Sequence, residues 1–589
     1  MFGISNQSYR FLHHSQATLV APEVVALDAP KTVGLLNGMF SFTKFGLNRC
    51  NQGFNDWWGS CTENEDFSSS YAHFTHAKPW ITPEDAFTHA AAVVEELSLI
   101  LTAGRLNPLS KDIITNAYAT KLPVSGDAAA HRLALQLILT TPEFHTSQIA
   151  IPSGLARPEP AQPSASGVPY KAVVMTMLAG GADSFNMIIP HTCTDAKDMY
   201  QDYKDVRLQV AMEKEDLIPL NDVSNQICEK FGLHPRYVNV ASMFNEGDAS
   251  WFVNIGQLDK ETDKYNYWKD TKTRLFAHNH MQQAAQRVDP NMEAFTTGVL
   301  GRMRDSMKQQ GLSAGGFSIN SSAAATNGMP GVNPSAVVLN SGGVVRFNKS
   351  PSDENMMTMI KELNQDMLPE SGVFADLWAD HLTSALATNE KLYETMSTKT
   401  TTVDFPTSNL GRQLETVSKM IDTRNERGAD RDVFYTSTGG FDTHSNTLMA
   451  TDNRFGALDE AFGAFREEMI AKGIWDSVVL MTVSDFGRTL NPNGNDGVDH
   501  AWGGNHVMMG GSVKGGQIHG EYPDDLTDFG PRMLTRGRAI PTMGWEKMFK
   551  PVAEWFGCPA EEMSWILPNM DNFPRQEYWT DNSDVLNVA

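Results

Sequence analysis

The chain is short of positive charge and of long apolar runs. Its 47 lysine and arginine residues stand against 70 aspartate and glutamate residues in 589 positions, a formal net charge of −23. Binding to nucleic acid needs a basic surface, so this balance argues against a nucleic acid partner. Every apolar run is too short to cross a bilayer, so we expect no membrane-spanning segment. The acidic residues are dispersed, as on a solvated globular surface.

Several motifs are also missing. The first 16 residues lack the basic and then apolar pattern of a signal peptide. We find no glycine loop of the kind that cradles phosphate and no solenoid repeat. These absences exclude the most easily recognised nucleotide-binding and repeat architectures.

Cysteine is scarce, with five residues that leave at least one unpaired. No Cys-x-x-Cys pair supports a structural zinc site. Cys50 with Cys61, and Cys193 with Cys228, are candidate disulfides if the protein is exported, with Cys558 buried beside aromatic residues. Alternatively, all five cysteines are reduced thiols, which would be ordinary in a chain of this length.

Three apolar, β-rich runs end in the same way. Lys171–Leu178 is followed by Gly-Gly-Ala-Asp-Ser, Asp432–Thr436 by a Gly-Gly-Phe-Asp-Thr-His sequence, and Val478–Met481 by Ser-Asp-Phe-Gly-Arg. Glycine lets the backbone turn sharply, and ligands in open α/β sheets lie at the carboxyl ends of strands. Asp with His suits zinc, whereas carboxylates alone suit magnesium, manganese or calcium. The pattern predicts a divalent metal site, the alternative being helix-capping Asp and surface His.

Other polar residues near these strand ends have two readings each. Arg488 can pair bidentately with a phosphate or sulfate oxyanion, or form a surface salt bridge. His278 can ligate a metal, act as an acid or base, or be an exposed helix position. His506 can shape the pocket, and Ser184 can be a nucleophile, a hydrogen-bond donor or, as we favour, a helix cap.

The composition predicts three segments. Residues 1–150 read as helical, with helices over 86–101 and 128–141, and residues 151–170 read as a linker rich in Pro, Ser, Gly and Ala. Residues 171–589 alternate strand and helix. Between the strands near 432 and 477, large apolar residues recur at helical spacing, which predicts a βαβ unit and a parallel sheet. The segment Ser313–Ser335, rich in small residues, is predicted to be a mobile loop near the site.

A set of motifs resembles a known family. They occur in the family's order and are GGADSFNMIIP, FGLHP, NLGRQLETVSKMI, GGFDTHSN, SDFGRT, VDHAWGGNH and AEWFGCPAEEMSWILPNM. They resemble domain of unknown function 1501, which is grouped with the alkaline phosphatase and sulfatase superfamily, over roughly Tyr170 to Phe573. The resemblance implies a doubly wound, mostly parallel α/β domain with one or two metals, in an extracellular or periplasmic protein.

The N-terminal segment resembles the C-terminal end of domain of unknown function 1800. This resemblance rests on APEVVALDAPKTVGLLNGMFSFTKFGL and the later ALQLILTTPEF. It implies that the chain is part of a longer protein or a truncated gene model, and a signal sequence could have been lost with the missing part.

The family resemblance also implies roles for individual residues. The implied metal ligands are Asp183, Asp442, His444, Asp485 and His500. Two positions depart from the superfamily pattern. Phe486 stands where many relatives have a His ligand, and Ala277 stands where related sequences carry the nucleophilic Ser.

Two functions therefore compete. The first is a metal-dependent hydrolase of phosphate or sulfate esters, small or polymeric, in which water is the nucleophile, Arg488 stabilises the oxyanion and His278 or His506 moves protons. The second is a surface or matrix protein that keeps the fold without turnover, as the missing hydroxyl at Ala277 suggests. The metal is zinc or magnesium, calcium or manganese, and the sequence leaves the oligomeric state open.

Overall fold

The protein divides into two compact units. The computed structural model describes residues 29–46, 83–159, 164–193, 197–223, 226–290, 297–329, 336–347, 355–573 and 582–587. Unit 1 comprises Met1–Ala161 and Val344–Ser397, and unit 2 comprises Gln162–Gly343 and Thr398–Ala589. Among the described residues, no helix combines the length and the apolar character needed to span a membrane.

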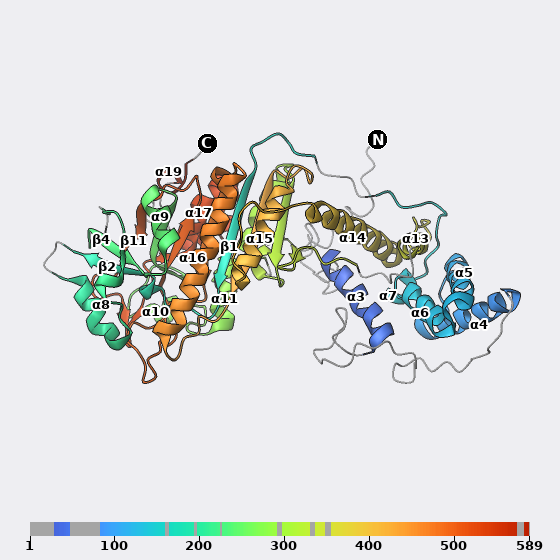
Figure 1. The fold of residues 1–589 in the computed structure, drawn as a ribbon, viewed down its shortest axis with the longest axis horizontal. Coiled ribbons are helices and arrows are strands. Elements are labelled where there is room, and N and C mark those ends of the chain that lie inside the picture. Colours follow the sequence, from blue (N-terminus) through green and yellow to red (C-terminus); the bar gives the residue numbers. More distant parts are fainter. Residues whose placement is uncertain are drawn as a thin grey trace. The chain divides into compact units, whose positions relative to one another are not determined.

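Unit 1 is helical (Figure 1). Its helices are α3 (Ala29–Phe45), α4 (Pro83–Thr102), α5 (Pro108–Ser125), α6 (Asp127–Ile138), α7 (Pro142–His145), α13 (Met356–Leu363) and α14 (Val373–Ser397). Helix α5 begins where the Asn107 side chain accepts a hydrogen bond from the Ser110 amide, with proline in its first turn. The helices expected over 86–101 and 128–141 are present as α4 and α6.

The compact units group the chain differently from the segments expected at 150 and 170. Val344–Ser397 belongs to unit 1 because α13 and α14 bury large apolar side chains, such as Ile360 and Trp378, in the same core as α4 to α6. The start of the expected linker is also tied to unit 1. Leu368 N donates to Ile151 O, and Asp366 N donates to Leu155 O, each at 2.9 Å.

Unit 2 is a mixed α/β structure built on a largely parallel sheet, as expected. The sheet has nine strands among the described residues, in the order β11-β5-β10-β9-β1-β8-β6-β7, with β14 beside β5. The strands are β1 (Lys171–Leu178), β5 (Ala249–Gly256), β6 (Ala314–Ile319), β7 (Val337–Leu339), β8 (Arg431–Thr438), β9 (Val478–Ser484), β10 (Gly504–Met509), β11 (Gln517–Gly520) and β14 (Met543–Gly544). Only β10 pairs antiparallel with its neighbours among these described strands.

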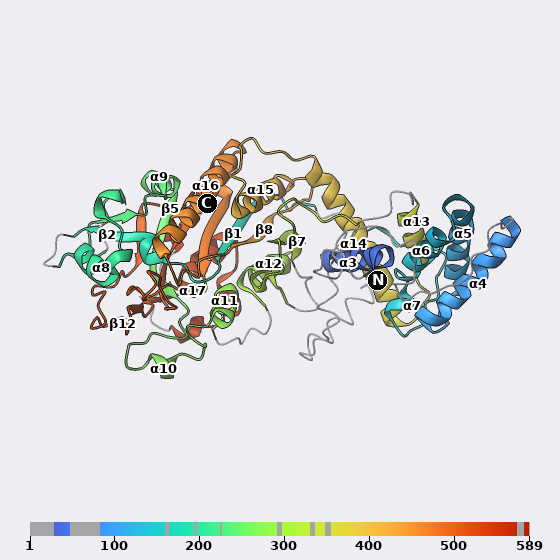
Figure 2. The ribbon, with the colours of Figure 1, turned by 60° about the horizontal axis from the view of Figure 1, so that its bottom comes forward.

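Helices cover both faces of this sheet (Figure 2). One layer contains α9 (Val238–Glu246), α15 (Asn409–Asp422) and α16 (Thr447–Ala471); the other contains α11 (His278–Arg287), α12 (Val299–Gln309) and α17 (Trp545–Phe556). The large apolar residues of α16, which the sequence placed at helical spacing, are buried. Strands β8 and β9, which α16 connects, are both parallel to β1 and lie on either side of it.

The expected mobile loop at Ser313–Ser335 is wrong in its first part. Ala314–Ile319 forms strand β6, parallel to β8, and the Phe317 ring stacks on Phe434 at 5.3 Å between centroids. Stacking and backbone pairing hold this stretch in the sheet despite its small residues. Residues 330–335 of the segment lie outside the described residues.

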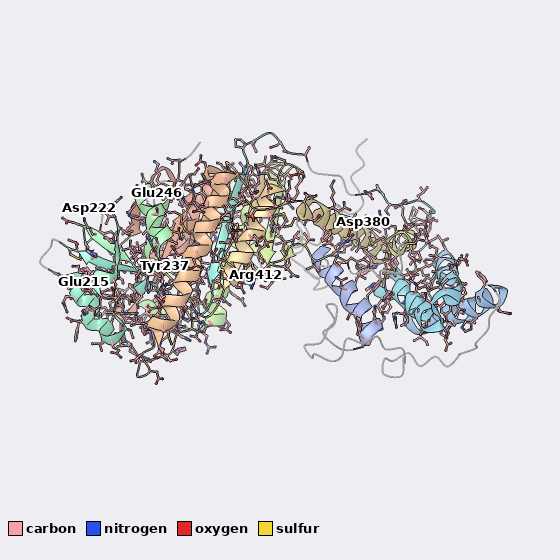
Figure 3. All side chains as sticks on the ribbon, viewed as in Figure 1. Glu215, Asp222, Tyr237, Glu246, Asp380 and Arg412 are labelled. Carbon is pink, nitrogen blue, oxygen red and sulfur yellow. A yellow bond between two sulfur atoms is a disulfide. The ribbon has the colours of Figure 1, made fainter. Side chains whose placement is uncertain are left out.

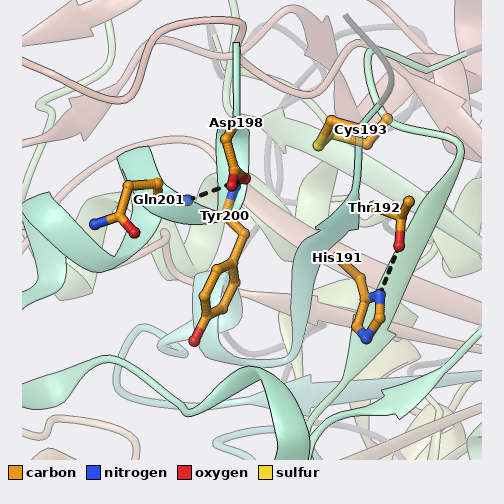
Figure 4. The surroundings of a disulfide bond; sticks show 7 residues. His191, Thr192, Cys193, Asp198, Tyr200 and Gln201 are labelled. Carbon is orange, nitrogen blue, oxygen red and sulfur yellow. Dashed lines mark hydrogen bonds between the residues drawn. A yellow bond between two sulfur atoms is a disulfide. The ribbon is translucent and has the colours of Figure 1, made fainter.

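A smaller sheet of β2 (Ile188–Thr192), β3 (Ile218–Pro219) and β4 (Lys230–Leu233) lies in unit 2. Cys193 and Cys228, which adjoin β2 and β4, form a disulfide (Figure 4). Cys558 is a buried free thiol, as expected. The candidate pair Cys50 and Cys61 lies outside the described residues.

Acidic side chains are exposed around this smaller sheet. Glu215, Asp222 and Glu246, labelled in Figure 3, are all exposed to solvent. Their spread over separate elements agrees with the dispersed negative charge of the sequence.

Candidate metal centre

Three strand ends meet at one edge of the main sheet. Because β1 is paired in parallel with both neighbours, Leu178 lies level with Thr438 of β8 and with Ser484 of β9. The chain leaves β9 directly into Asp485 and leaves β8 through two glycines toward Asp442. The three apolar runs singled out in the sequence therefore deliver their polar residues to the same place.

The turn after β1 needs glycine at two positions. Gly180 and Gly181 have φ values of +114° and +75°. A Cβ atom on Gly180 would lie 2.7 Å from the Asp442 amide nitrogen, and one on Gly181 would lie 2.4 Å from the Phe486 ring. Glycine thus allows the β1 turn to approach the two neighbouring strand ends closely.

A group of imidazole and carboxylate side chains lies at these strand ends. His278 Nε2 is 3.1 Å from His500 Nε2, and each of these nitrogens is 3.5 Å from Asp442 Oδ1. This is the one cluster of three side chains with metal-ligand spacing among the described residues. His444 adjoins it without belonging to it, with Nε2 at 3.1 Å from His500 Nε2 and 2.9 Å from Asp442 Oδ1.

Each of the three imidazoles is held through its Nδ1 atom by an acceptor. The pairs are His278 with Asp485 Oδ2 at 2.7 Å, His444 with Asp499 Oδ1 at 2.8 Å and His500 with the Phe276 carbonyl at 2.9 Å. A carboxylate or carbonyl can only accept, so we assign the proton of each neutral ring to Nδ1. All three Nε2 lone pairs therefore face the group.

The electrostatics favour a neutral His500 ring and ionised carboxylates at Asp442 and Asp499. Burial lowers the pKa of His500, although its bond to the Phe276 carbonyl opposes this. Burial opposes ionisation of Asp442, but the hydrogen bond and charge of Arg488, together with His444 and His278, outweigh it and lower the pKa of this carboxyl. The pKa of Asp499 falls to about 2, because hydrogen bonds from partners such as His444 outweigh burial. The group is thus rich in electron pairs at neutral pH.

Arg488 lies beside this group, and its guanidinium donates to backbone carbonyl groups of the protein and to Asp442. Its side chain is fully buried; Nε donates to Gly181 O at 2.7 Å and Nη1 to Val498 O at 3.1 Å. Nη2 donates to Gly180 O and to Asp442 Oδ1. The oxyanion contact expected for Arg488 is therefore not what the structure shows, because internal acceptors occupy the guanidinium.

Asp183 is not brought into the group. Its buried carboxylate pairs with Arg207 of helix α8 (Met199–Arg207) at 2.5 Å, and both side chains are fully buried. The next residue, Ser184, is also buried, and its hydroxyl accepts from the Asn505 amide at 2.8 Å. Both residues therefore tie the β1 turn into the core rather than facing the strand-end group.

His506 is likewise outside the group. It lies within β10, buried, with its ring 4.9 Å from that of Trp545. Burial lowers its pKa to about 3, so it is uncharged at neutral pH, and its ring lies away from the strand-end group. Alternation along β10 aims this side chain at the core.

Phe486 and Ala277 frame the histidines. The Phe486 ring lies 4.7 Å from the ring of His278 and 4.8 Å from that of His500, between centroids. Ala277 caps the N-terminus of α11 with no side-chain hydrogen bond. Phe486 and Ala277 thus both adjoin the group, Phe486 through apolar packing and Ala277 as a residue without a hydroxyl.

The sequence pointed to four residues at this centre as ligands but did not reveal which residues hold the histidines in place. Asp442 and His500 lie in the cluster with His278, His444 adjoins it, and Asp485 holds His278 instead of facing the group itself. The partnership of Asp499 with His444 was not anticipated. Its only signal was its place directly before His500, which does not reveal which histidine it contacts.

Comparisons with known proteins place the chain in a family. No curated protein matches it. Similar solved structures include the lipoteichoic acid synthase LtaP from Listeria monocytogenes, with 10% identity, a TM-score of 0.27 and coverage of 71% of this chain and 76% of that one. An alkaline phosphatase superfamily protein from Vibrio parahaemolyticus has 9% identity, a TM-score of 0.27 and coverage of 65% and 70%. The PsFucS1 sulfatase from Pseudoalteromonas sp. has 11% identity and a TM-score of 0.25, with coverage of 59% of this chain and 64% of that one. The family model described as protein of unknown function (DUF1501) matches residues 170–532, more than half of the chain, and the chain therefore belongs to that family.

Proposed function

We propose that the protein is a divalent-metal-dependent hydrolase of phosphate or sulfate esters, with His278, Asp442 and His500 as the metal ligands. One observation carries the proposal. Two Nε2 lone pairs and a carboxylate oxygen lie 3.1 to 3.5 Å from one another, with a third lone pair, that of His444, beside them. Such atoms repel one another unless a cation lies between them.

The donor set suits zinc best. Zinc binds His nitrogen and carboxylate oxygen at roughly 2.0–2.2 Å in a tetrahedron, which separates neighbouring ligand atoms by about 3.3 Å. The three distances in the group bracket that value. Magnesium and calcium prefer all-oxygen sites, so two imidazoles argue against them. Three protein ligands also leave one position open, as in catalytic zinc sites.

The supports around the ligands fit the same assignment. The carboxylate of Asp485 and the carbonyl of Phe276 fix the ring orientations of His278 and His500 through Nδ1. Acceptors in these positions are typical of histidines that bind metal through Nε2. Arg488 holds Asp442 from the other side of the hydrogen bond, because its buried guanidinium donates to the carboxylate.

The reaction we propose is direct hydrolysis by water. When bound, the metal supplies a Lewis acid that polarises the ester and promotes ionisation of water. The water oxygen forms a bond to phosphorus or sulfur, the bond to the ester oxygen breaks, and the leaving alcohol takes up a proton. Ala277 offers no hydroxyl that could replace water in this step.

His444 is the residue placed to move the proton. Its side chain is about half exposed, its Nδ1 donates to Asp499, and its Nε2 lone pair faces the group, where it can accept the proton of the attacking water. A histidine oriented by a carboxylate is a standard general base. We therefore assign His278, expected as an acid or base, to metal binding, and His444, expected as a ligand, to proton transfer.

The second candidate is a non-catalytic protein that keeps the fold. It is favoured by the departures at Phe486 and Ala277, which remove one superfamily ligand and the hydroxyl nucleophile. It predicts a bound metal without turnover.

The disulfide between Cys193 and Cys228 supports an exported protein, because such bonds persist in oxidising compartments. We propose an extracellular or periplasmic location on this ground.

Metal analysis followed by an activity screen tests the proposal. We expect purified protein to hold close to one zinc per chain and, after chelation, to recover hydrolysis of an aryl phosphate or aryl sulfate only when zinc is restored. His278→Ala should lose both metal and activity, whereas His280→Ala, two positions along α11, should keep both. Protein that takes up no zinc would overturn the proposal, and zinc-loaded protein that is inactive across a broad panel would favour the non-catalytic candidate.

A further inference from the structure

The proposed hydrolase lacks the anion-binding group that the sequence predicted. A phosphate or sulfate ester carries negative charge on its non-bridging oxygens, and a nearby cation with free N–H groups would bind them. Arg488 does not qualify, because its nitrogens donate to Gly180, Gly181, Val498 and Asp442. The remaining candidates are the other cationic side chains beside the proposed ligands.

A short hairpin brings two arginines to the centre. Strands β12 (Met533–Leu534) and β13 (Arg538–Ala539) pair antiparallel, and the turn between them carries Arg536. Arg536 forms an ion pair with Asp499, the acceptor that orients His444. Its charge is therefore compensated, which leaves Arg538.

Arg538 is fixed beside the metal ligands by two contacts. Its Nε donates to the carbonyl of His500 at 2.9 Å, and its guanidinium carbon lies 4.9 Å from the centre of the Phe276 ring. Phe276 in turn accepts the Nδ1 proton of His500 through its carbonyl. The side chain is partly buried, so the planar group is held against the same elements that hold the ligand.

The two terminal nitrogens of Arg538 remain available. Within the described residues, neither has a hydrogen-bond or ion-pair partner, since the only polar contact of this side chain is through Nε. The neighbouring carboxylates already have partners: Asp442 has Arg488, Asp485 has His278, and Asp499 has His444 and Arg536. A positioned guanidinium with two free donors matches two oxygens of a phosphate or sulfate group.

We propose that Arg538 binds the non-bridging oxygens of the substrate ester, an inference that rests on the proposed hydrolase function. Arg538 is then the anion-recognition residue, and Arg536 positions His444 through Asp499. The ligand class is a tetrahedral oxyanion attached to the leaving alcohol, which phosphate and sulfate esters share.

The test measures anion binding apart from turnover. Zinc-loaded wild type, Arg538→Gln and Arg538→Lys would be titrated with inorganic phosphate and, separately, with inorganic sulfate by calorimetry, and KM and kcat would be measured on the best aryl ester. Loss of a charge-assisted pair costs about 1.5–3 kcal/mol, so we expect a rise of roughly 10- to 100-fold in Kd and KM for Arg538→Gln. Arg538→Lys should recover part of the loss. The arm with the tighter wild-type Kd identifies the ester class.

The matched control is Arg532→Gln, because Arg532 precedes the same hairpin but donates to the Thr262 carbonyl at 2.8 Å. This variant should bind both anions as wild type does. Unchanged anion affinity in Arg538→Gln with zinc retained would overturn the role of Arg538 and leave the hydrolase proposal intact. Wild-type protein that binds zinc but neither anion would also overturn it. If Arg538→Gln also loses zinc, the Arg538→Lys variant becomes the test. A lysine variant that keeps its zinc and binds the anions with the wild-type Kd would contradict bidentate recognition by Arg538.

Discussion

At the scale of single residues, the hydrogen-bond partner decides the role. Arg488 and Arg538 are the same residue type and both lie at the candidate metal centre. The first is saturated by internal acceptors, and the second keeps two free donors. Asp485 is equally instructive, because it faces the Nδ1 atom of His278 rather than the centre itself. Its carboxylate acts by holding a ligand in the required tautomer.

This assignment predicts the effect of Asp485→Asn. An amide keeps the shape but removes the charge that favours the Nδ1–H tautomer, so zinc affinity should fall by about 10- to 100-fold, as is usual when such a support is lost. Competition with a chromophoric chelator measures this. Asp496→Asn is the control, since its side chain is exposed and, among the described residues, its carboxylate accepts a hydrogen bond from Gln209 alone. Wild-type zinc affinity in Asp485→Asn would contradict the support role.

At the scale of elements, the centre depends on how closely the β1 turn approaches its neighbours. Because the strands are parallel and in register, β8, β1 and β9 end at the same level of the sheet. Glycines then let the turn after β1 contact the segments that follow β8 and β9. Arg488 connects them by donating to the carbonyl oxygens of Gly180 and Gly181 and to Asp442. The turn is therefore part of the centre although it supplies no ligand.

We expect Gly180→Ala to disturb the fold and the centre together. The new Cβ would lie 2.7 Å from the Asp442 amide nitrogen, in a backbone conformation of positive φ. The cost should be about 1–3 kcal/mol of unfolding free energy, with weaker zinc binding. Gly439→Ala is a matched control, because its Cβ meets nothing within 4 Å and its φ is not positive. Denaturant unfolding and zinc titration of both variants measure the contrast, and equal behaviour would refute the close approach as the cause.

At the scale of the whole molecule, two compact units share one chain that passes between them three times. Unit 2 contains the family match and the candidate centre, and it is interrupted by Val344–Ser397 of unit 1. Its stability depends on buried cores, on a disulfide and, through pH, on several buried histidines. Each of these features gives a measurable dependence on conditions.

The disulfide should contribute substantially to the stability of unit 2. It closes a loop with a sequence separation of 35 residues between Cys193 and Cys228. Loop-closure entropy for that length predicts a loss of about 3–4 kcal/mol in the Cys193→Ser, Cys228→Ser double variant. Calorimetric melting should show a lower Tm, with the wild type falling to a similar value in reductant. Equal melting of the two proteins without reductant would indicate that the bond does not form in solution.

Buried histidines should make the protein less stable in mild acid. Burial lowers the pKa of His506 to about 3 and the pKa values of His234 and His519 to about 4, from an ordinary value of about 6.5. Between these values the unfolded chain binds more protons, so unfolding free energy falls as pH drops from about 6.5 toward 4 and is insensitive to these groups above that range.

The His506→Gln variant tests this dependence. It should flatten the slope by about one proton, or roughly 1.4 kcal/mol per pH unit. Denaturant unfolding of metal-free protein at a series of pH values measures it. A slope equal to that of the wild type would show that His506 is protonated in the folded state.

Much of this protein was readable from its sequence because it depends on local pattern. The apolar runs predicted β1, β8 and β9, the helical spacing predicted α16, and the positions of Asp442 and Asp485 after strand ends followed from the order of the chain. Backbone conformation and burial along a run follow from neighbouring residues, so these features need no knowledge of distant contacts.

Tertiary structure alone decided what each polar side chain does. Asp183 and Asp442 follow the same Gly-Gly-x-Asp pattern after parallel neighbouring strands, yet one is sealed in the core and the other lies half exposed at the centre. The difference comes from partners far along the chain: Arg207 on α8 neutralises Asp183, whereas Asp442 meets Arg488 and three imidazoles. A buried charge requires a compensating partner, and only the folded chain shows which carboxylate receives it.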